Sequence, residues 1–156
     1  MLPTPSRESI MQAFLALVTA RMAQNGYPYL PVKRGMVLAS QLGDIEQPAL
    51  FLREFDENMK QQGRGLPGIR TFTIFMIAYD KRPENVPGAT VANPLLDAME
   101  GALFPDNTLV DTVTLNVAGV PLAYQCQIDG TIVKETGDTD PNGQILIIVP
   151  VKLISS

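Results

Sequence analysis

Apolar and polar positions alternate through the last third of the chain in the pattern of β-strands. Apolar and polar residues alternate between Val120 and Ile128, as expected for a strand with one buried face. Residues 145–149 are all apolar, which is typical of a strand covered on both faces. Because Asp129–Gly130 is a two-residue turn signal, we expect a hairpin in which residues 131–135 run back along residues 120–128. Pro150 fits a buried strand only at a bulge or an edge.

Two segments show the period of an amphipathic helix. In the first, apolar residues recur at i, i+4, i+7 and i+8, at Ile10, Phe14, Leu17 and Val18. This spacing predicts a helix over residues 6–24, with Thr4 as its N-cap and Asn25–Gly26 at its end. The second helix is expected to start at the similar signal Asn93–Pro94 and to end before Pro105.

Two strands are predicted between the helices, on either side of a polar segment. Residues 48–55 and 70–79 have strand character, and a shorter strand is expected at residues 36–38. The polar, glycine-rich segment between the two strands has no apolar period and predicts a long, exposed, mobile loop over residues 56–69. The strand at 70–79 is apolar on both faces, so its second face needs cover from a subunit partner or from a loop of the same chain.

The order of these elements predicts an α+β fold. We expect a single domain over residues 1–156, with an antiparallel or mixed β-sheet of about five to six strands and both amphipathic helices packed on one face. A chain of 156 residues suits one domain, and its 46% apolar content supplies a core.

Composition narrows the classes of function. A formal charge of −4 argues against an extended nucleic-acid surface. The absence of histidine removes the most common general base and metal ligand. The single cysteine, Cys126, cannot form an internal disulfide and is expected in the core. We see no signal peptide and no apolar run approaching the ~20 residues of a membrane span, so we expect synthesis and use in the cytoplasm, without a membrane.

Some motifs match chemical signatures without the context that the chemistry needs. Gly63–Gly68 has the letters of a dinucleotide-binding loop, but a strand rather than a helix is expected after it. Asp138–Gly143 matches half of a calcium loop, but Val149 replaces the bidentate glutamate. The carboxylates within residues 54–57 are more simply solvated than catalytic. We therefore predict no enzyme and no catalytic, cofactor-binding or metal-binding residues.

Short segments over most of the chain follow the order and spacing of a known family. They are Gln47–Leu52, Arg64–Pro67, Asn93–Met99, Leu115–Gly119, Cys126–Gly130 and Gln144–Leu153. In this order they resemble the tail terminators of long-tailed bacteriophages, also called tail completion or minor tail proteins. The chain departs from that family in a longer polar run before Gly65 and in the turn at residues 138–143.

The resemblance implies a structural virion protein rather than an enzyme. Tail terminators form a ring, usually a hexamer, that caps the tail tube, stops its elongation and presents a head–tail joining surface. The implied partners are further copies of this chain, the tail tube protein and the connector or neck protein, with DNA only passing through the lumen. The implied location is the head-proximal end of the tail in the virion, and the host cytoplasm during assembly.

The implied contacts fall on the polar segment and on the strand after it. We expect the tube or another partner to contact Lys60, Gln61, Gln62, Arg64 and Arg70, and the ring interface to use Phe75, Ile77 and Tyr79. Two alternatives stay open: a neck, head-completion or other minor tail protein, and a soluble α+β ligand-binding or regulatory module of another class.

Overall fold

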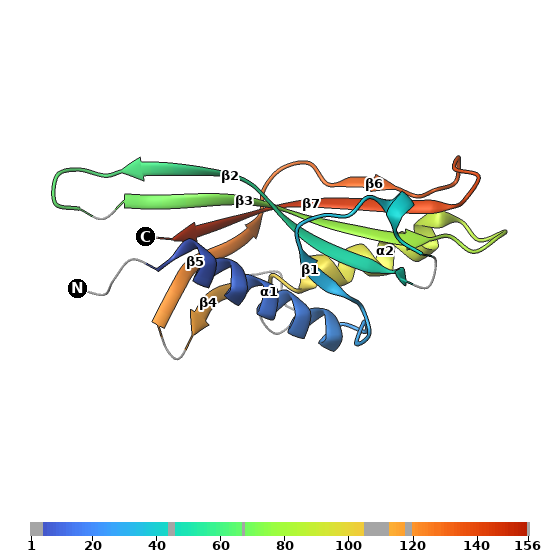
Figure 1. Cartoon of the computed structure of the whole chain (residues 1–156), viewed down its shortest axis with the longest axis horizontal. Coiled ribbons are helices and arrows are strands. Elements are labelled where there is room, and N and C mark those ends of the chain that lie inside the picture. Colours follow the sequence, from blue (N-terminus) through green and yellow to red (C-terminus); the bar gives the residue numbers. More distant parts are fainter. Residues whose placement is uncertain (1–4, 44–45, 67, 105–112, 118–119, 156) are drawn as a thin grey trace.

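The computed structural model describes residues 5–43, 46–66, 68–104, 113–117 and 120–155. Within these ranges two α-helices lie on one face of a single seven-stranded sheet (Figure 1). The elements are α1 (Arg7–Gln24), β1 (Val32–Arg34), the 3-10 helix η1 (Ala39–Gln41), β2 (Ala49–Gln61), β3 (Gly68–Lys81), α2 (Gly88–Gly101), β4 (Val113–Val117), β5 (Val120–Ile128), β6 (Val133–Glu135) and β7 (Gln144–Ser155). The prediction of an α+β fold with a mixed sheet and both helices on one face is confirmed.

The strands follow the order β1-β2-β3-β7-β5-β4, and β6 pairs with β7 as well. The β1–β2 pair is parallel, and the other described pairs are antiparallel. β5 pairs with the C-terminal half of β7 and β6 with its N-terminal half, so both lie along the same edge of β7.

The hairpin predicted at Asp129–Gly130 is therefore wrong, because the chain continues from β5 to β6 without reversing. The Asp129 amide donates to the carbonyl of Pro150 at 3.2 Å. In an antiparallel strand the N–H and C=O of one residue point to the same neighbour. The nitrogen of Pro150, which has no hydrogen to donate, therefore faces the gap between β5 and β6. This position explains how a proline is tolerated in the strand.

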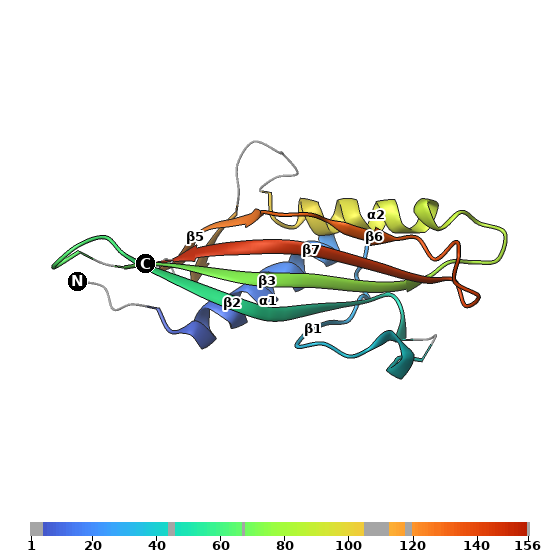
Figure 2. The ribbon, with the colours of Figure 1, turned by 90° about the horizontal axis from the view of Figure 1, so that it is seen from above.

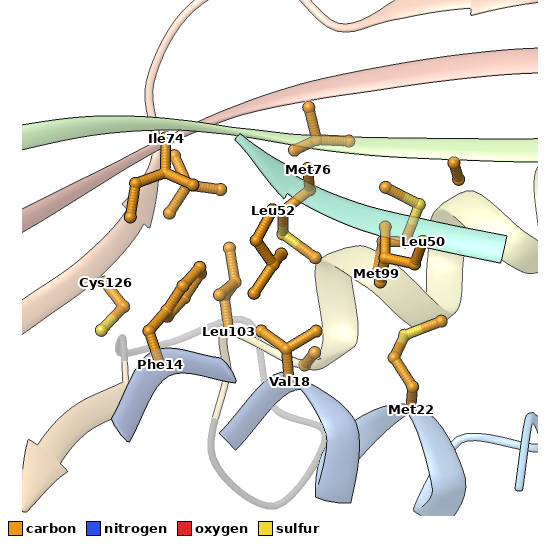
Figure 3. Packing of buried hydrophobic residues seen from close by; sticks show 14 of the residues in the cluster. Phe14, Val18, Met22, Leu50, Leu52, Ile74, Met76, Met99, Leu103 and Cys126 are labelled. Atoms are coloured by element: carbon orange, nitrogen blue, oxygen red, sulfur yellow. The ribbon is translucent and has the colours of Figure 1, made fainter. Parts of the chain in front are cut away.

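The main core lies between the helices and the sheet. Figure 3 shows Phe14, Val18 and Met22 of α1 pointing towards the sheet, in the same cluster as Leu50, Leu52, Ile74, Met76, Met99 and Leu103. The first helix matches its prediction closely, although its N-cap is Ser6, whose hydroxyl accepts from the Ser9 amide at 3.1 Å. Thr4, the predicted cap, lies outside the described residues. The same holds for Gly119, the last residue of the segment Leu115–Gly119.

The outer face of the sheet carries a smaller cluster. Ile77 and Tyr79 pack there with Ala49 and Phe51, and the rings of Phe51 and Tyr79 meet edge to face at 5.9 Å. Ala39 of η1 and the following Leu42 pack against this cluster. At this end of the sheet, the cover is therefore a loop of the same chain. The strand predicted at 36–38 is wrong, because that segment leaves the sheet after β1 and leads into η1.

Helix α2 starts earlier than predicted. It begins at Gly88 rather than near Asn93, and Pro94 lies inside it. Its first amide, that of Gly88, donates to a carboxylate oxygen of Asp138 at 2.9 Å. The anchor of this helix end comes from a loop far along the chain, so no local signal marks it.

The largest correction concerns residues 56–69, which form the far half of a β-hairpin instead of a loop. β2 continues to Gln61 and β3 begins at Gly68, with these two residues paired. β7 ends at Ser155, opposite Arg70, so the hairpin extends beyond it. Figures 1 and 2 show the hairpin projecting past the end of the sheet.

Candidate interaction surface on the projecting hairpin

The outer edge of β2 is largely open. β1 pairs only with residues 50–52, and Gly35 adds one hydrogen bond to the Leu52 carbonyl at 2.9 Å. Within the described ranges, no strand pairs with residues 53–61 on that side. An unpaired strand edge presents backbone donors and acceptors to another chain, and it is a common protein–protein contact.

Charge is segregated along the chain. Residues 58–79 contain three cations, Lys60, Arg64 and Arg70, and no Asp or Glu. Because the whole chain carries −4 and this segment carries +3, the remaining residues carry −7. The projecting part of the hairpin is thus the basic end of an acidic molecule.

Four of the five predicted partner-contact residues gather at the hairpin tip, which we define as residues 60–66. Lys60, Gln61, Gln62 and Arg64 are all exposed there. Arg70 differs, because only 4% of it is exposed. Its Nη2 donates to the carbonyl of Pro5 at 2.7 Å, and its guanidinium lies 5.4 Å from the Phe72 ring centroid. Burial lowers the pKa of Arg70. Arg70 therefore ties the start of α1 to β3 and has little surface for a partner.

The predicted ring-interface residues also differ in how much of each side chain is exposed. Ile77 and Tyr79 are 3% and 4% exposed within the chain itself, so little of either side chain is available to a neighbour. Phe75 is partly exposed, and its ring lies 5.0 Å from that of Phe55. Only Phe75 keeps useful surface for the predicted interface, and that interface stays a prediction.

Three exposed apolar residues on the hairpin were not singled out from the sequence. Phe55, Met59 and Leu66 are 57%, 56% and 56% exposed. Phe55 lies at a β-bulge, where the pairing with β3 shifts between Glu54 and Asp56. Exposed apolar side chains that gather on one element often mark a contact site. For two of them the sequence does carry a signal, because Met59 and Leu66 are apolar residues in the otherwise polar segment that follows Asp56.

A cavity of about 300 Å³ opens between α1 and the base of the hairpin. We call it the base cavity. Its lining combines the apolar side chains of Met11, Phe72 and Ile74 with the charged side chains of Arg7, Glu54 and Glu57.

Two sets of ion pairs frame the base cavity. Arg7 of α1 forms a bidentate pair with Glu57 of β2 at 2.7 and 2.8 Å. The hydrogen bond between these side chains raises the pKa of Arg7 and lowers the pKa of Glu57. Arg34 joins Glu8 of α1 to Glu54 of β2. Asp56 makes no hydrogen bond or ion pair within the described part of the chain. Because it pairs with Thr73 and follows the alternation of the strand next to Glu57, its side chain lies on the outer face of the sheet, away from α1.

The motifs with chemical signatures have structural roles. Gly65 has a φ of +78° at the hairpin tip, and β3 rather than a helix follows Gly63–Gly68. Asp138 accepts from the Gly88 amide and from the Thr136 hydroxyl, and these hydrogen bonds lower its pKa. Asp140 accepts from the Asn142 amide in a local turn. In the described ranges, no group of three or more His, Cys, Asp or Glu is placed to hold a metal ion.

Cys126 lies in the core, as predicted. It is fully buried, and burial raises the pKa of its thiol to about 12. Because the thiolate is the reactive form of cysteine, this residue is not an activated nucleophile.

No helix in the described ranges is both long and apolar enough to cross a membrane. Comparison with models of known protein families gives no match for this chain, and no curated protein matches its sequence.

Proposed function

We propose that this chain is a tail terminator of a long-tailed bacteriophage. It forms a ring, most simply a hexamer, that caps the tail tube, stops its elongation and offers a surface for head joining. The ordered resemblance of short segments supplies the family. The observation that carries the proposal is the β2–β3 hairpin, which projects beyond the sheet with exposed polar, basic and apolar side chains.

A closed ring needs two different surfaces on each subunit, because each copy meets its two neighbours through different sides. At the hairpin end, the sheet has two unlike edges, formed by β2 and β4. The open backbone of residues 53–61 and the exposed Phe55 give the β2 side a surface suited to a neighbour. These features support assembly into a ring.

The tube contact is assigned to Lys60, Gln61 and Gln62, at the end of β2. All three are exposed and lie beyond the last residue of β7, away from the core. We propose a role without catalysis, cofactor or metal, in which specificity comes from surface contacts with the tube and the connector.

The test adds purified protein to polymerising tail tube protein and measures tube length by electron microscopy. The native chain is expected to stop elongation. A variant with Lys60→Glu, Gln61→Ala and Gln62→Ala is expected to fold and to leave the tubes growing. Glu84→Gln, an exposed change beyond the opposite end of β3, is the control and should cap normally.

Two results would contradict parts of this proposal. Tubes that elongate freely beside the native protein would exclude a terminator and favour a neck or head-completion protein. Normal capping by the triple variant would show that the tube contact lies elsewhere on the ring.

A further inference from the structure

We propose that the β6 edge of one copy adds to the β1 flank of a second copy, so that their two sheets join edge to edge. The β1 flank comprises β1 and residues 36–38, which follow it. In this contact Lys33 of one copy lies near Glu135 of the next, and residues 36–38 meet Val133. The inference rests on the proposed assembly into a ring, and it names the contact that joins neighbouring subunits.

The two edges lie at the same level on opposite sides of the sheet. A row of paired residues crosses five strands, from Lys33 through Phe51, Ile77 and Ile148 to Val133. Figure 2 shows β1 on one flank of this half of the sheet and β6 on the other. Within the described residues, β1 pairs only with β2 and β6 only with β7. Each therefore presents an unpaired strand edge, which can pair with a strand of another chain.

Strand direction favours this pairing. β1 is parallel to β2, whereas each step from β2 through β3 and β7 to β6 is antiparallel. β1 and β6 therefore run in opposite directions within one sheet. When a second copy continues the sheet with the same face outward, its β6 runs antiparallel to β1, which is the slightly more stable kind of pair. The contact is heterologous, and heterologous contacts repeat into rings or open chains.

The two edges carry complementary charges. Lys33 and Glu135 are exposed, and neither makes a hydrogen bond or ion pair within the described part of the chain. Both lie on the outer face, because their pairing partners Phe51 and Leu146 belong to the outer-face cluster. Paired strands bring together residues of the same face, so Lys33 lies opposite either Glu135 or Val133. In the second case Glu135 is the diagonal neighbour, still within reach of a long side chain.

The other cations of these two strands do not oppose the contact. Arg34 pairs with Glu8 of α1 and Glu54 of β2 on the helix face. Lys134 Nζ donates to Oδ1 of Asn93 in α2 at 2.8 Å. Both positive charges are thus occupied on the face away from Lys33.

Exposed apolar residues lie beside both edges. Met36, Val37 and Leu38 are 42%, 36% and 55% exposed, and Val133 is 38% exposed. The first three have the strand character noted in the sequence but pair with no strand within the described residues. They lead into η1, whose Ala39 packs on the outer-face cluster, and Val133 lies in the same row of the sheet as that cluster. Contact between copies would remove both apolar groups from water.

Cysteine crosslinking tests the contact directly. A disulfide requires Cα atoms within about 7 Å, whereas four strand spacings of about 4.8 Å put the two edges roughly 19 Å apart within one chain. Oxidation of Lys33→Cys mixed with Val133→Cys or with Glu135→Cys should give a covalent dimer in at least one of the two mixtures. The native Cys126 is fully buried and does not interfere. The control mixture, Lys33→Cys with Arg64→Cys at the exposed hairpin tip, should not crosslink.

Charge reversal tests the ion pair. Lys33→Glu and Glu135→Lys are each expected to raise the Kd of self-association about fivefold, because attraction becomes repulsion. The combined variant should return the Kd to within about twofold of the native value. Both side chains are exposed and make no bond within the described part of the chain, so the unfolding midpoint should not change. Glu84→Lys should leave the Kd unchanged.

The outcomes separate this contact from the proposed function. A ring-sized assembly in which neither Lys33→Cys mixture crosslinks, or in which the control mixture crosslinks equally, overturns the contact and leaves the ring standing. A combined charge variant that associates no better than the single variants also overturns the contact. Crosslinked subunits that extend only into open chains uphold the contact and contradict the terminator. A protein that stays monomeric and uncrosslinked at every concentration contradicts both.

Discussion

Gly88 lies where α2 meets the loop at Thr136, and alanine at this position should destabilise the fold strongly. A Cβ atom on Gly88 would lie 1.6 Å from the Thr136 carbonyl oxygen and 2.6 Å from its carbonyl carbon. Both are backbone atoms, so either the helix or the loop must move. That movement would also separate the Gly88 amide from Asp138, which accepts its hydrogen bond at 2.9 Å.

The expected loss follows from the steric conflict. Overpacking a well-packed site costs ~1–3 kcal/mol, and a clash with backbone belongs at the upper end of that range. The better helix propensity of alanine offsets at most about 1 kcal/mol. We therefore expect Gly88→Ala to lower the free energy of unfolding by about 2–3 kcal/mol.

Urea unfolding measures this change. With an m value of about 2 kcal/mol/M, the midpoint should fall by roughly 1–1.5 M. The control is Gly43→Ala, an exposed position where an added Cβ would have no atom within 4 Å. This variant should stay within about 0.5 kcal/mol of the native chain. A Gly88→Ala midpoint equal to that of the control would refute the reasoning.

Three further predictions concern the core, the thiol and the pH dependence. Phe14→Ala removes a side chain that is 1% exposed and should cost ~3–5 kcal/mol in urea unfolding, so a loss below about 1 kcal/mol would contradict the packing. Cys126, with its pKa raised to about 12, should react with a thiol reagent at pH 8 only as fast as the protein unfolds, and rapid reaction in native buffer would contradict its burial. The pKa of Asp138 is lowered below 3.8 in the folded state; because the folded pKa is depressed, its stabilisation is present above about pH 4 and is lost as the pH falls through the folded pKa. Asp138→Asn should therefore flatten the fall of the melting temperature below pH 4, and parallel curves for the two proteins would contradict this role.

Elements with one buried face could be predicted from the sequence. The alternation between Val120 and Ile128 gives the bounds of β5 as observed, and the 3.6-residue stripe from Ile10 to Val18 places α1. In α1, the apolar side chains pack in the core, so the burial of one face of the helix produces the periodic pattern in the sequence.

The hairpin could not be predicted in this way, because its far half has no buried face. Residues 53–61 are all exposed, so β2 continues there through backbone pairing with β3 and leaves no alternating pattern. The start of α2 was missed for another reason. Its first amide is held by Asp138, 50 residues later, while the local signal at Asn93–Pro94 falls inside the helix.

The candidate surface was predicted only in part. The basic residues Lys60 and Arg64 stood out by charge, and both are exposed at the hairpin tip. Asp56 as an open carboxylate and Phe55 as an exposed ring depend on the bulge after Glu54, which the sequence does not indicate. Arg70 was grouped with the tip by charge, but it faces α1.

The molar mass of the purified protein, measured by light scattering across a wide range of concentrations, tests the central claim most directly. Assembly into a terminator ring predicts one discrete species, of about six times the 17.0 kDa of a single chain. The mass of that species should not increase further with concentration, because a closed ring leaves no free contact. A mass of 17.0 kDa at every concentration, or one that grows without limit, would contradict the account.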